Sequence, residues 1–210
     1  MTDKIVLPRM PSFRLDGRRA LVTGAGRGIG RAAAAALADA GAEVTLAARS
    51  ADEVEAVASA IRDAGGKAEA LTLDVTDTAT AKAEIAARGP FQILINNAGT
   101  NRPALLADMT ESDYDAVTDL NVRASIFVAQ AVAQGLMEAK LPGSIINISS
   151  QMGHVGGPKR TVYCATKHAI EGATKAMAWE LGPQGIRVNT ICPTFIETPM
   201  TEGMLEDDAF

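Results

Sequence analysis

The chain has 210 residues and a formal net charge of −5, so it offers no basic surface of the kind that binds nucleic acid. No uncharged apolar run reaches the length of a membrane span. The chain has two cysteines, too few for a disulfide framework, which predicts a reducing compartment, the cytoplasm. Their spacing is not that of metal ligands, so no metal site is predicted. Hydrophobic residues make up 47% and aromatic residues 4%, which predicts one α/β domain with an aliphatic core rich in alanine.

Short apolar runs alternate with amphipathic stretches after an irregular lead-in over residues 1–16. Strands are predicted at residues 20–22, 44–47, 68–73, 93–95, 144–148 and 186–191. Helical patterns cover residues 29–40, 51–64, 78–88, 111–140 with a break, and 163–181. This alternation predicts right-handed crossovers and a parallel sheet with helices on both faces. Such a sheet binds ligands beyond the carboxyl ends of its strands, so we expect the functional residues there, in a single domain over residues 17–210.

A glycine-rich turn follows the first predicted strand and precedes a helical pattern. Glycines there permit a tight turn and close approach of a phosphate, and the helix start offers unpaired N–H groups to it. A plain turn without chemistry is the alternative, but the position between strand and helix favours a dinucleotide site. The residues concerned are Gly24, Gly26, Arg27, Gly28, Ile29 and Gly30.

The T-G-x-x-x-G-x-G spacing of this turn resembles the short-chain dehydrogenase/reductase family, and the resemblance extends over residues 19–200. It implies a three-layer, doubly wound Rossmann sheet with strand order 3-2-1-4-5-6. The family continues with a further helix and a seventh strand, whereas this sequence ends within the segment that forms the substrate lid. We therefore expect six strands and an incomplete lid from about residue 194.

Two further motifs match cofactor positions of the family. Asp74 and Val75 follow the third predicted strand, where the family aspartate receives the adenine amino group. Asn97, Ala98 and Gly99 follow the fourth strand and match the motif beside the adenine ribose. Without the resemblance, Asp74 is equally a helix cap and the asparagine–glycine run a plain turn.

The end of the second predicted strand bears on the choice of cofactor. NAD enzymes place a carboxylate there for the ribose 2′-hydroxyl, whereas this sequence has Ala48 and Arg49. A guanidinium binds a 2′-phosphate bidentately, and Arg27 can supply a second cation. The sequence therefore favours NADP(H), with NAD(H) as the alternative if both arginines only decorate the surface.

Tyr163 and Lys167 lie four residues apart on a predicted helix, so they share one face and can meet over the same ligand. Reduction of a carbonyl needs an acid for its oxygen, and the reverse reaction needs a base. A neighbouring ammonium favours phenolate, and so does the positive nicotinamide of an oxidised cofactor, so we expect the pKa of Tyr163 to fall by about 2–3 when both are in place. A serine thirteen positions earlier, Ser150, stands at the predicted end of the fifth strand.

The resemblance assigns a role to each of these residues. Tyr163 matches the general acid/base, and Ser150 matches the hydroxyl that polarises the substrate oxygen. Lys167 matches the lysine that holds the nicotinamide ribose. Asn121 matches the asparagine whose helix kink positions a water between that lysine and solvent. Ser149 is the rival for the hydroxyl role, although the spacing favours Ser150.

The segment that begins at Pro193, after the sixth predicted strand, completes the cofactor positions. The resemblance assigns the backbone of Ile196 and the side chain of Thr198 to the nicotinamide carboxamide. Thr194 stands where the family usually has glycine, which is expected to reshape the entrance of the loop.

Together these residues predict an oxidoreductase that moves a hydride between NAD(P)(H) and a small-molecule carbonyl or secondary alcohol. A 3-oxoacyl thioester and a sugar or polyol are the two substrate classes considered. The pocket candidates are Arg102, Gln151, His154 and the loop over residues 156–161, which contains Lys159 and Arg160. The three cations Arg102, Lys159 and Arg160 fit a solvated rim as well as an acidic substrate. A non-catalytic dinucleotide sensor or scaffold on the same fold is the alternative.

Assembly is a separate expectation. The helical stretches over residues 111–140 and 163–181 exceed what the cover of one sheet face requires, and the family pairs the equivalent helices between subunits. The sequence therefore predicts a homodimer or a homotetramer, without a nucleic-acid or membrane partner.

Overall fold

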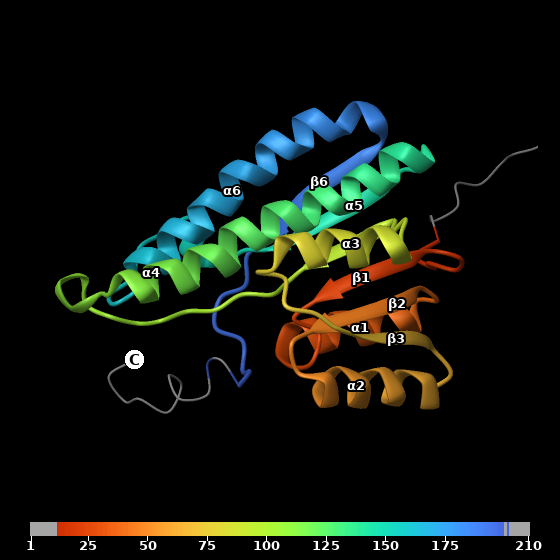
Figure 1. Cartoon of the computed structure of the whole chain (residues 1–210), viewed down its shortest axis with the longest axis horizontal. Helices are drawn as coiled ribbons and strands as arrows, with labels where there is room; N and C mark the ends of the chain where they lie inside the picture. The colour runs from red at the N-terminus through yellow and green to blue at the C-terminus, as the bar shows by residue number, and fades with distance from the viewer. Residues whose placement is uncertain (1–11, 200, 202–210) are drawn as a thin grey trace, which may run out of the picture.

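The protein, described here from a computed structural model that covers residues 12–199 and residue 201, is built on a six-stranded parallel sheet (Figure 1). The strand order is β3-β2-β1-β4-β5-β6, which confirms the predicted order. Residues 1–11 of the predicted lead-in lie outside the described residues. The strands are β1 (Arg19–Thr23), β2 (Glu43–Ala48), β3 (Lys67–Thr72), β4 (Ile93–Asn96), β5 (Gly143–Ile148) and β6 (Ile186–Ile191).

Six α-helices connect these strands within the described part of the chain, and polar caps fix several of their starts. The side chains of Ser50, Asp77 and Thr110 accept hydrogen bonds from backbone N–H groups in the first turns of α2, α3 and α4. The predicted break in residues 111–140 is a π-helical segment, Asp119–Ala124. The helices are α1 (Gly28–Asp39), α2 (Ala51–Asp63), α3 (Thr78–Arg88), α4 (Glu111–Thr118), α5 (Ser125–Ala139) and α6 (Thr161–Leu181).

The sheet separates two hydrophobic cores, because successive side chains of a strand point to opposite faces. Leu21 of β1 packs in the core that contains buried residues of α3 and α5, with Met177 and Leu181 of α6 against it. Its neighbours Ala20 and Val22 pack in the core that α1 and α2 cover. Figure 1 shows these two groups of helices on opposite sides of the sheet. Burial on both faces explains the continuous apolar runs of β1, β2 and β4, whereas the edge strands β3 and β6 have exposed positions in alternation.

The turn between β1 and α1 is held against the end of β4 by close packing. Gly24 adopts a φ of +63°, in the left-handed region that favours glycine. A Cβ atom on Gly30 would collide with the carbonyl oxygen of Gly24 and would lie 2.5 Å from Asn97 Nδ2. The first turn of α1 can therefore approach the loop only with glycine at position 30.

The segment after β6 has no helix or strand over residues 192–199 and 201. The remaining positions of the predicted lid, residues 200 and 202–210, lie outside the described residues. Among the described helices, none combines the length and the apolar character needed to cross a membrane.

We expect Gly30→Ala to destabilise the fold by about 1–3 kcal/mol, because the added methyl group overlaps backbone that cannot move aside. Gly172→Ala is the matched control, since Gly172 lies on α6 with no atom within 4 Å of a built Cβ. That change should stabilise the helix by about 0.5–1 kcal/mol. Urea unfolding of both variants measures the difference, and a Gly30→Ala protein as stable as the wild type would contradict the packing argument.

Candidate active site

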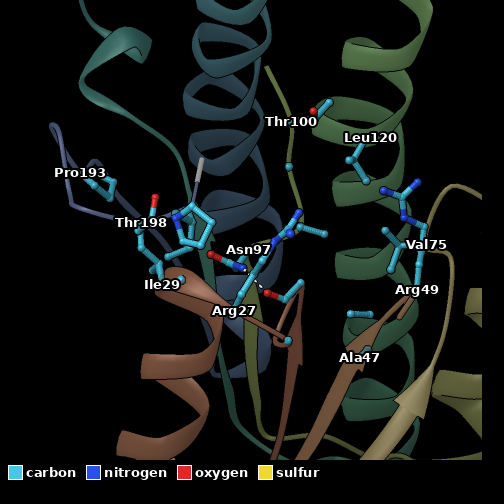
Figure 2. A pocket seen from close by; sticks show the side chains of 18 of the residues that line it. Arg27, Ile29, Ala47, Arg49, Val75, Asn97, Thr100, Leu120, Pro193 and Thr198 are labelled. Carbon is cyan, nitrogen blue, oxygen red and sulfur yellow. Dashed lines mark hydrogen bonds between the residues drawn. The ribbon is translucent and has the colours of Figure 1, made fainter. Parts of the chain in front are cut away.

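A pocket of about 370 Å³ lies at the carboxyl ends of the strands, where the sheet topology places ligands (Figure 2). Segments that follow all six strands contribute to its wall. Every site residue predicted from the sequence lines it, with the exceptions of Gly30 and Asn121. The predicted residues on the wall are Gly24, Gly26, Arg27, Gly28, Ile29, Arg49, Asp74, Val75, Asn97, Ala98, Gly99, Ser150, Tyr163, Lys167, Pro193, Ile196 and Thr198.

Asn97 joins the end of β4 to the glycine-rich turn. Its Nδ2 atom donates to the carbonyl oxygens of Thr23 and Gly24, at 3.0 and 3.1 Å. The buried Thr23 hydroxyl in turn accepts from the backbone N–H groups of Asn97 and Ala98, each at 3.0 Å. The Asn97 amide therefore sets the shape of the turn, and it is more than the plain turn that was the alternative interpretation.

Two arginines flank the pocket. Arg27 of the glycine-rich turn lies with Nη1 3.7 Å from Oε1 of Glu53, a residue in the first turn of α2. Arg49 lies at the end of β2 and lines the same wall, close to Val75 in Figure 2. Both side chains thus stand where the sequence analysis placed cations, and Arg27 has a carboxylate beside it.

Asp74 is not the helix cap that was its alternative interpretation, because Asp77 caps α3. Its Oδ1 accepts hydrogen bonds from the backbone N–H and the hydroxyl of Thr76, at 2.9 and 2.7 Å, so it stabilises a local turn. It also lines the pocket. Burial raises the pKa of this carboxyl, but the Thr76 hydrogen bonds and the charge of Arg49 outweigh burial and hold the pKa below its usual value. Asp74 is therefore ionised near neutral pH.

Lys167 is a buried cation fixed to the sheet. Its ammonium donates to the carbonyl oxygen of Ile148, at 2.8 Å, where β5 ends. Burial lowers its pKa from 10.5 to about 8, although the charges of Cys192 and Glu171 oppose the fall. Its Nζ lies 5.5 Å from the ring centroid of Tyr163, so the two side chains share one face of α6 as predicted.

The protein's own groups do not lower the pKa of Tyr163. Burial raises the pKa of the phenol above 10.0, and the opposing effects of the Ser150 hydroxyl and the Arg160 charge are smaller. Removal of the phenolate from water therefore outweighs its charged neighbours. Tyr163 is a protonated acid near neutral pH.

The adjacent serines lie in different surroundings. The Ser150 hydroxyl forms a hydrogen bond with Tyr163 that opposes the rise of the phenol pKa. Its Oγ also accepts from the backbone N–H of Met152 at 3.1 Å. Ser149 Oγ lies beside Glu171 and Cys192 instead. It is buried and has no hydrogen-bond partner of acceptable geometry among the described residues. The position beside the phenol thus belongs to the serine that the spacing favoured.

Asn121 lies in the π-helical segment, next to Lys167 and away from the pocket wall. Its Oδ1 accepts from the backbone N–H of Thr100 at 2.8 Å, and its Nδ2 donates to Thr100 O and Thr166 Oγ1. A Cβ built on Gly99 would lie 3.3 Å from Asn121 Oδ1 and 3.9 Å from Lys167 Nζ, which places both side chains around that glycine. Both polar atoms of the Asn121 amide are therefore hydrogen-bonded to Thr100 and Thr166.

The segment after β6 returns to the glycine-rich turn. The backbone N–H of Gln151 donates to Pro193 O at 3.0 Å, and Thr198 lies beside Ile29 in Figure 2. The Thr198 hydroxyl lies 3.1 Å from that of Thr201.

The residues suggested for a substrate pocket, Arg102, Gln151 and His154, do not line this pocket. The Arg102 side chain pairs with Asp113 at 3.0 Å.

Comparison with known proteins agrees with this geometry. A sequence profile of short chain dehydrogenases matches residues 18–209. D-erythrulose reductase of Gallus gallus is 44% identical over 190 residues, which are 90% of this chain and 76% of that protein. A 3-oxoacyl-(acyl-carrier-protein) reductase of Thermotoga maritima is 39% identical over 92% of this chain and 80% of its own length. The crystal structure of a gluconate 5-dehydrogenase from Burkholderia cenocepacia in complex with NADP and tartrate has a TM-score of 0.89 and 39% identity, with 95% of this chain and 79% of that chain covered.

The chain belongs to the short-chain dehydrogenase/reductase family. It is therefore an oxidoreductase that acts on a small-molecule carbonyl or alcohol with a nicotinamide dinucleotide. The wall of the pocket fits such a cofactor, because Gly24, Gly26 and Gly28 bring backbone without side chains to it, and Arg27 and Arg49 add positive charge. Helix α1 also directs its N-terminus at this turn, a favourable position for a pyrophosphate.

Several lining residues of this oxidoreductase were missed by the sequence reasoning. Glu53 reaches back from α2, so that a Cβ on Gly26 would lie 2.7 Å from its Oε2. Thr100 and Leu120 also line the pocket. The only signal for Glu53 was its place three residues after the helix cap Ser50, which marks a helix start and says nothing about which loop the side chain meets.

The pKa of Lys167 predicts a dependence of stability on pH. Below a pH of about 8 the folded chain must hold a buried ammonium, a penalty that the unfolded chain does not have. The penalty disappears as the pH rises towards the unfolded pKa of about 10.5, so the unfolding free energy of the wild type relative to Lys167→Met should rise by about 2–3 kcal/mol between about pH 7 and about pH 10.5. Urea unfolding at both pH values measures this, and a constant difference would show that burial does not perturb Lys167.

Proposed function

We propose that this short-chain dehydrogenase/reductase is an NADP(H)-preferring enzyme that interconverts a short polyhydroxy ketone and the corresponding secondary alcohol. The observation that carries the proposal is the meeting of Ser150, Tyr163 and Lys167 in one pocket whose wall also holds the glycine-rich turn and Arg49. An acid, a hydroxyl donor, a fixed cation and a phosphate-compatible turn are what reversible carbonyl reduction requires.

The bound dinucleotide supplies or accepts the hydride. During reduction Tyr163 gives its phenolic proton to the substrate oxygen, a role that its raised pKa suits. Ser150 donates a hydrogen bond to the same oxygen. Lys167, held by the Ile148 carbonyl, would bind the ribose hydroxyls of the cofactor and would stabilise the phenolate that proton transfer leaves. In the reverse direction the same phenolate removes the proton of the alcohol.

Asn121 has a positioning role in this proposal. Because its amide is occupied by Thr100 and Thr166, its contribution comes through the backbone of the π-helical segment. A π-helical turn shifts carbonyl groups out of the regular helical ladder, and such turns are common at functional sites. We infer that this backbone holds the water that connects Lys167 with solvent.

The preference for NADP(H) rests on charge. Arg49 directly follows β2, where a carboxylate would repel a 2′-phosphate, and Arg27 of the glycine-rich turn lines the same pocket. Glu53 partly neutralises Arg27, at a distance of 3.7 Å, so Arg49 is the main candidate for the phosphate contact. The gluconate 5-dehydrogenase structure with NADP supports this assignment.

The substrate class is proposed from the relatives. D-erythrulose reductase and gluconate 5-dehydrogenase are both named for short polyhydroxy compounds, and both are similar to this chain over most of its length. The similarity to a 3-oxoacyl-(acyl-carrier-protein) reductase makes an acyl thioester the second candidate. A panel of tetrulose, pentulose and keto-gluconate compounds beside a 3-oxoacyl thioester, each with NADPH and NADH, separates the two.

Tyr163→Phe should lower kcat for ketone reduction at least about 100-fold, because general acid catalysis is lost while the ring remains. Tyr163 is also predicted to contact the cofactor, but NADPH binding, followed by fluorescence, should stay within about threefold of the wild type, since the glycine-rich turn, Arg49 and Lys167 keep their places on the pocket wall. Tyr114→Phe is the matched control at the only other tyrosine, which is exposed on α4. Equal kcat values for wild type and Tyr163→Phe would refute the assignment, and a wild type that binds NADPH but reduces no compound in the panel would favour the non-catalytic alternative.

Arg49→Ala should raise the Kd for NADPH by about 10–100-fold, because hydrogen bonds to a charged group contribute about 1.5–3 kcal/mol. The Kd for NADH, which has no 2′-phosphate, should change less than about threefold. Arg187→Ala, at an exposed position of β6, is the control and should leave both values unchanged. Parallel losses for NADPH and NADH would mean that Arg49 does not read the phosphate.

We further propose one domain over residues 17–210, assembled as a homodimer or homotetramer in the cytoplasm. The exposed apolar side chains Phe127 and Met137 of α5 and Trp179 of α6 support assembly, and the free thiols of Cys164 and Cys192 fit a reducing location. Light scattering of the purified chain should give at least twice the mass of 21.8 kDa. A monomer at micromolar concentration would contradict the proposed assembly.

A further inference from the structure

Three potential metal ligands from separate elements meet behind Lys167. His154 follows the short 3-10 turn after β5, Glu171 lies on α6, and Cys192 directly follows β6. His154 Nε2 lies 3.4 Å from Cys192 Sγ and 3.8 Å from Glu171 Oε2, and Cys192 Sγ lies 3.2 Å from Glu171 Oε1. One imidazole nitrogen, one thiol sulfur and one carboxylate oxygen thus lie within 4.8 Å of one another.

The spacing of these atoms matches what a tetrahedral zinc ion imposes. Bonds of about 2.0–2.3 Å at tetrahedral angles place neighbouring ligand atoms roughly 3.4–3.6 Å apart. The 3.4 Å separation between His154 Nε2 and Cys192 Sγ falls in that range. The Glu171 carboxylate lies 3.2 Å from the thiol through Oε1 and 3.8 Å from the imidazole through Oε2, so a rotation of this side chain would bring one of its oxygens to the ion. We propose that His154, Glu171 and Cys192 form a Zn²⁺ site, with water as the fourth ligand.

The surroundings of Glu171 support a built site. The residue is 7% exposed, and Thr190 Oγ1 donates to its Oε2 at 3.2 Å, which orients the carboxylate. The unpartnered Ser149 hydroxyl is buried beside it, and a Cβ on Gly153 would lie 2.9 Å from Ser149 Oγ and 3.1 Å from Glu171 Cγ. A buried donor therefore stands next to the carboxylate and to Cys192, with glycine at the position that keeps the space open.

Metal binding would replace the hydrogen bond between Cys192 and Glu171 with one from Ser149 to Glu171. The Cys192 thiol now donates its proton towards Glu171 Oε1. When Cys192 binds Zn²⁺ as a thiolate, that proton leaves to solvent, and Ser149 becomes the donor that replaces it on the carboxylate. His154, with a side chain 54% exposed, provides the open side through which the ion enters. The site would brace the loop after Ser150 against α6 and the end of β6.

The choice of Zn²⁺ follows from the ligand types. A thiolate with an imidazole selects zinc-like ions, whereas Mg²⁺ prefers oxygen ligands alone. Co²⁺ occupies zinc sites and gives a charge-transfer absorption when a thiolate is bound to it, so it reports both binding and the identity of the ligand. The proposed site does not include Ser150, Tyr163 or Lys167, so its failure would leave the proposed reaction untouched.

The test uses the whole chain, metal-free, titrated with Co²⁺ and then with Zn²⁺. We expect a saturable thiolate-to-Co²⁺ band at one equivalent, displaced by Zn²⁺ and unaffected by Mg²⁺. Cys192→Ser should abolish the band, and Cys164→Ser should retain it. His154→Ala should raise the Kd for Zn²⁺ in calorimetry by more than about 10-fold, because the loss of even a supporting hydrogen-bond partner costs that much. His168→Ala should leave the Kd unchanged.

These controls are matched because the chain has only two cysteines and two histidines. Circular dichroism and NADPH binding verify that each variant folds. Glu171→Gln, which keeps the shape of the buried side chain, should weaken Zn²⁺ binding while the Co²⁺–thiolate band persists at higher metal concentration. The absence of a saturable band in the wild type, or an equal band in Cys192→Ser, would overturn the proposal.

Discussion

The hydrogen bond from Lys167 to the Ile148 carbonyl joins the helix that carries the acid to the sheet that carries the cofactor turn. A buried ammonium needs such an acceptor, since burial already lowers its pKa to about 8. This contact fixes α6 against the end of β5, so Tyr163 and Ser150 share one place. The cofactor turn is tied to β4 by Asn97 in the same way. Two polar contacts at neighbouring strand ends thus define the site.

The pleat of β5 explains how one short segment serves two environments. Consecutive residues of a strand point to opposite sides, and this alternation continues into the serines that follow Ile148. Ser150 therefore lies with the phenol, whereas Ser149 lies with Glu171 and Cys192. Glu171 is one helical turn beyond Lys167, so the stripe Tyr163, Lys167 and Glu171 extends from the pocket to the second cluster. The proposed metal site would share this scaffold without sharing the chemistry.

Much of the fold was readable from the sequence because its signals are local. Continuous apolar runs gave the six strands, and the break in residues 111–140 marked the π-helical segment that carries Asn121. The spacing of Ser150, Tyr163 and Lys167 is also a local signal, and it correctly predicted that the three side chains line one pocket. The pKa of Tyr163 was not predictable, because the balance between burial and neighbouring charge depends on packing that the sequence does not state.

Long-range contacts account for the other misses. His154 and Cys192 are 38 residues apart and meet Glu171 only through the crossover of α6, so no spacing rule could connect them. Glu53 beside Arg27 has the same origin. Arg102 is the opposite case. Its position after the fourth strand suggested a place in the pocket, but its side chain pairs with Asp113 and does not line the pocket.

A crystal structure of the chain with NADPH and a ketone would show whether Tyr163 and Ser150 share one substrate oxygen. The account predicts the reacting carbonyl oxygen within hydrogen-bond distance of both Tyr163 and Ser150, with Lys167 on the ribose and Arg49 on the 2′-phosphate. A dinucleotide bound elsewhere, or a ketone that reaches neither hydroxyl, would contradict it.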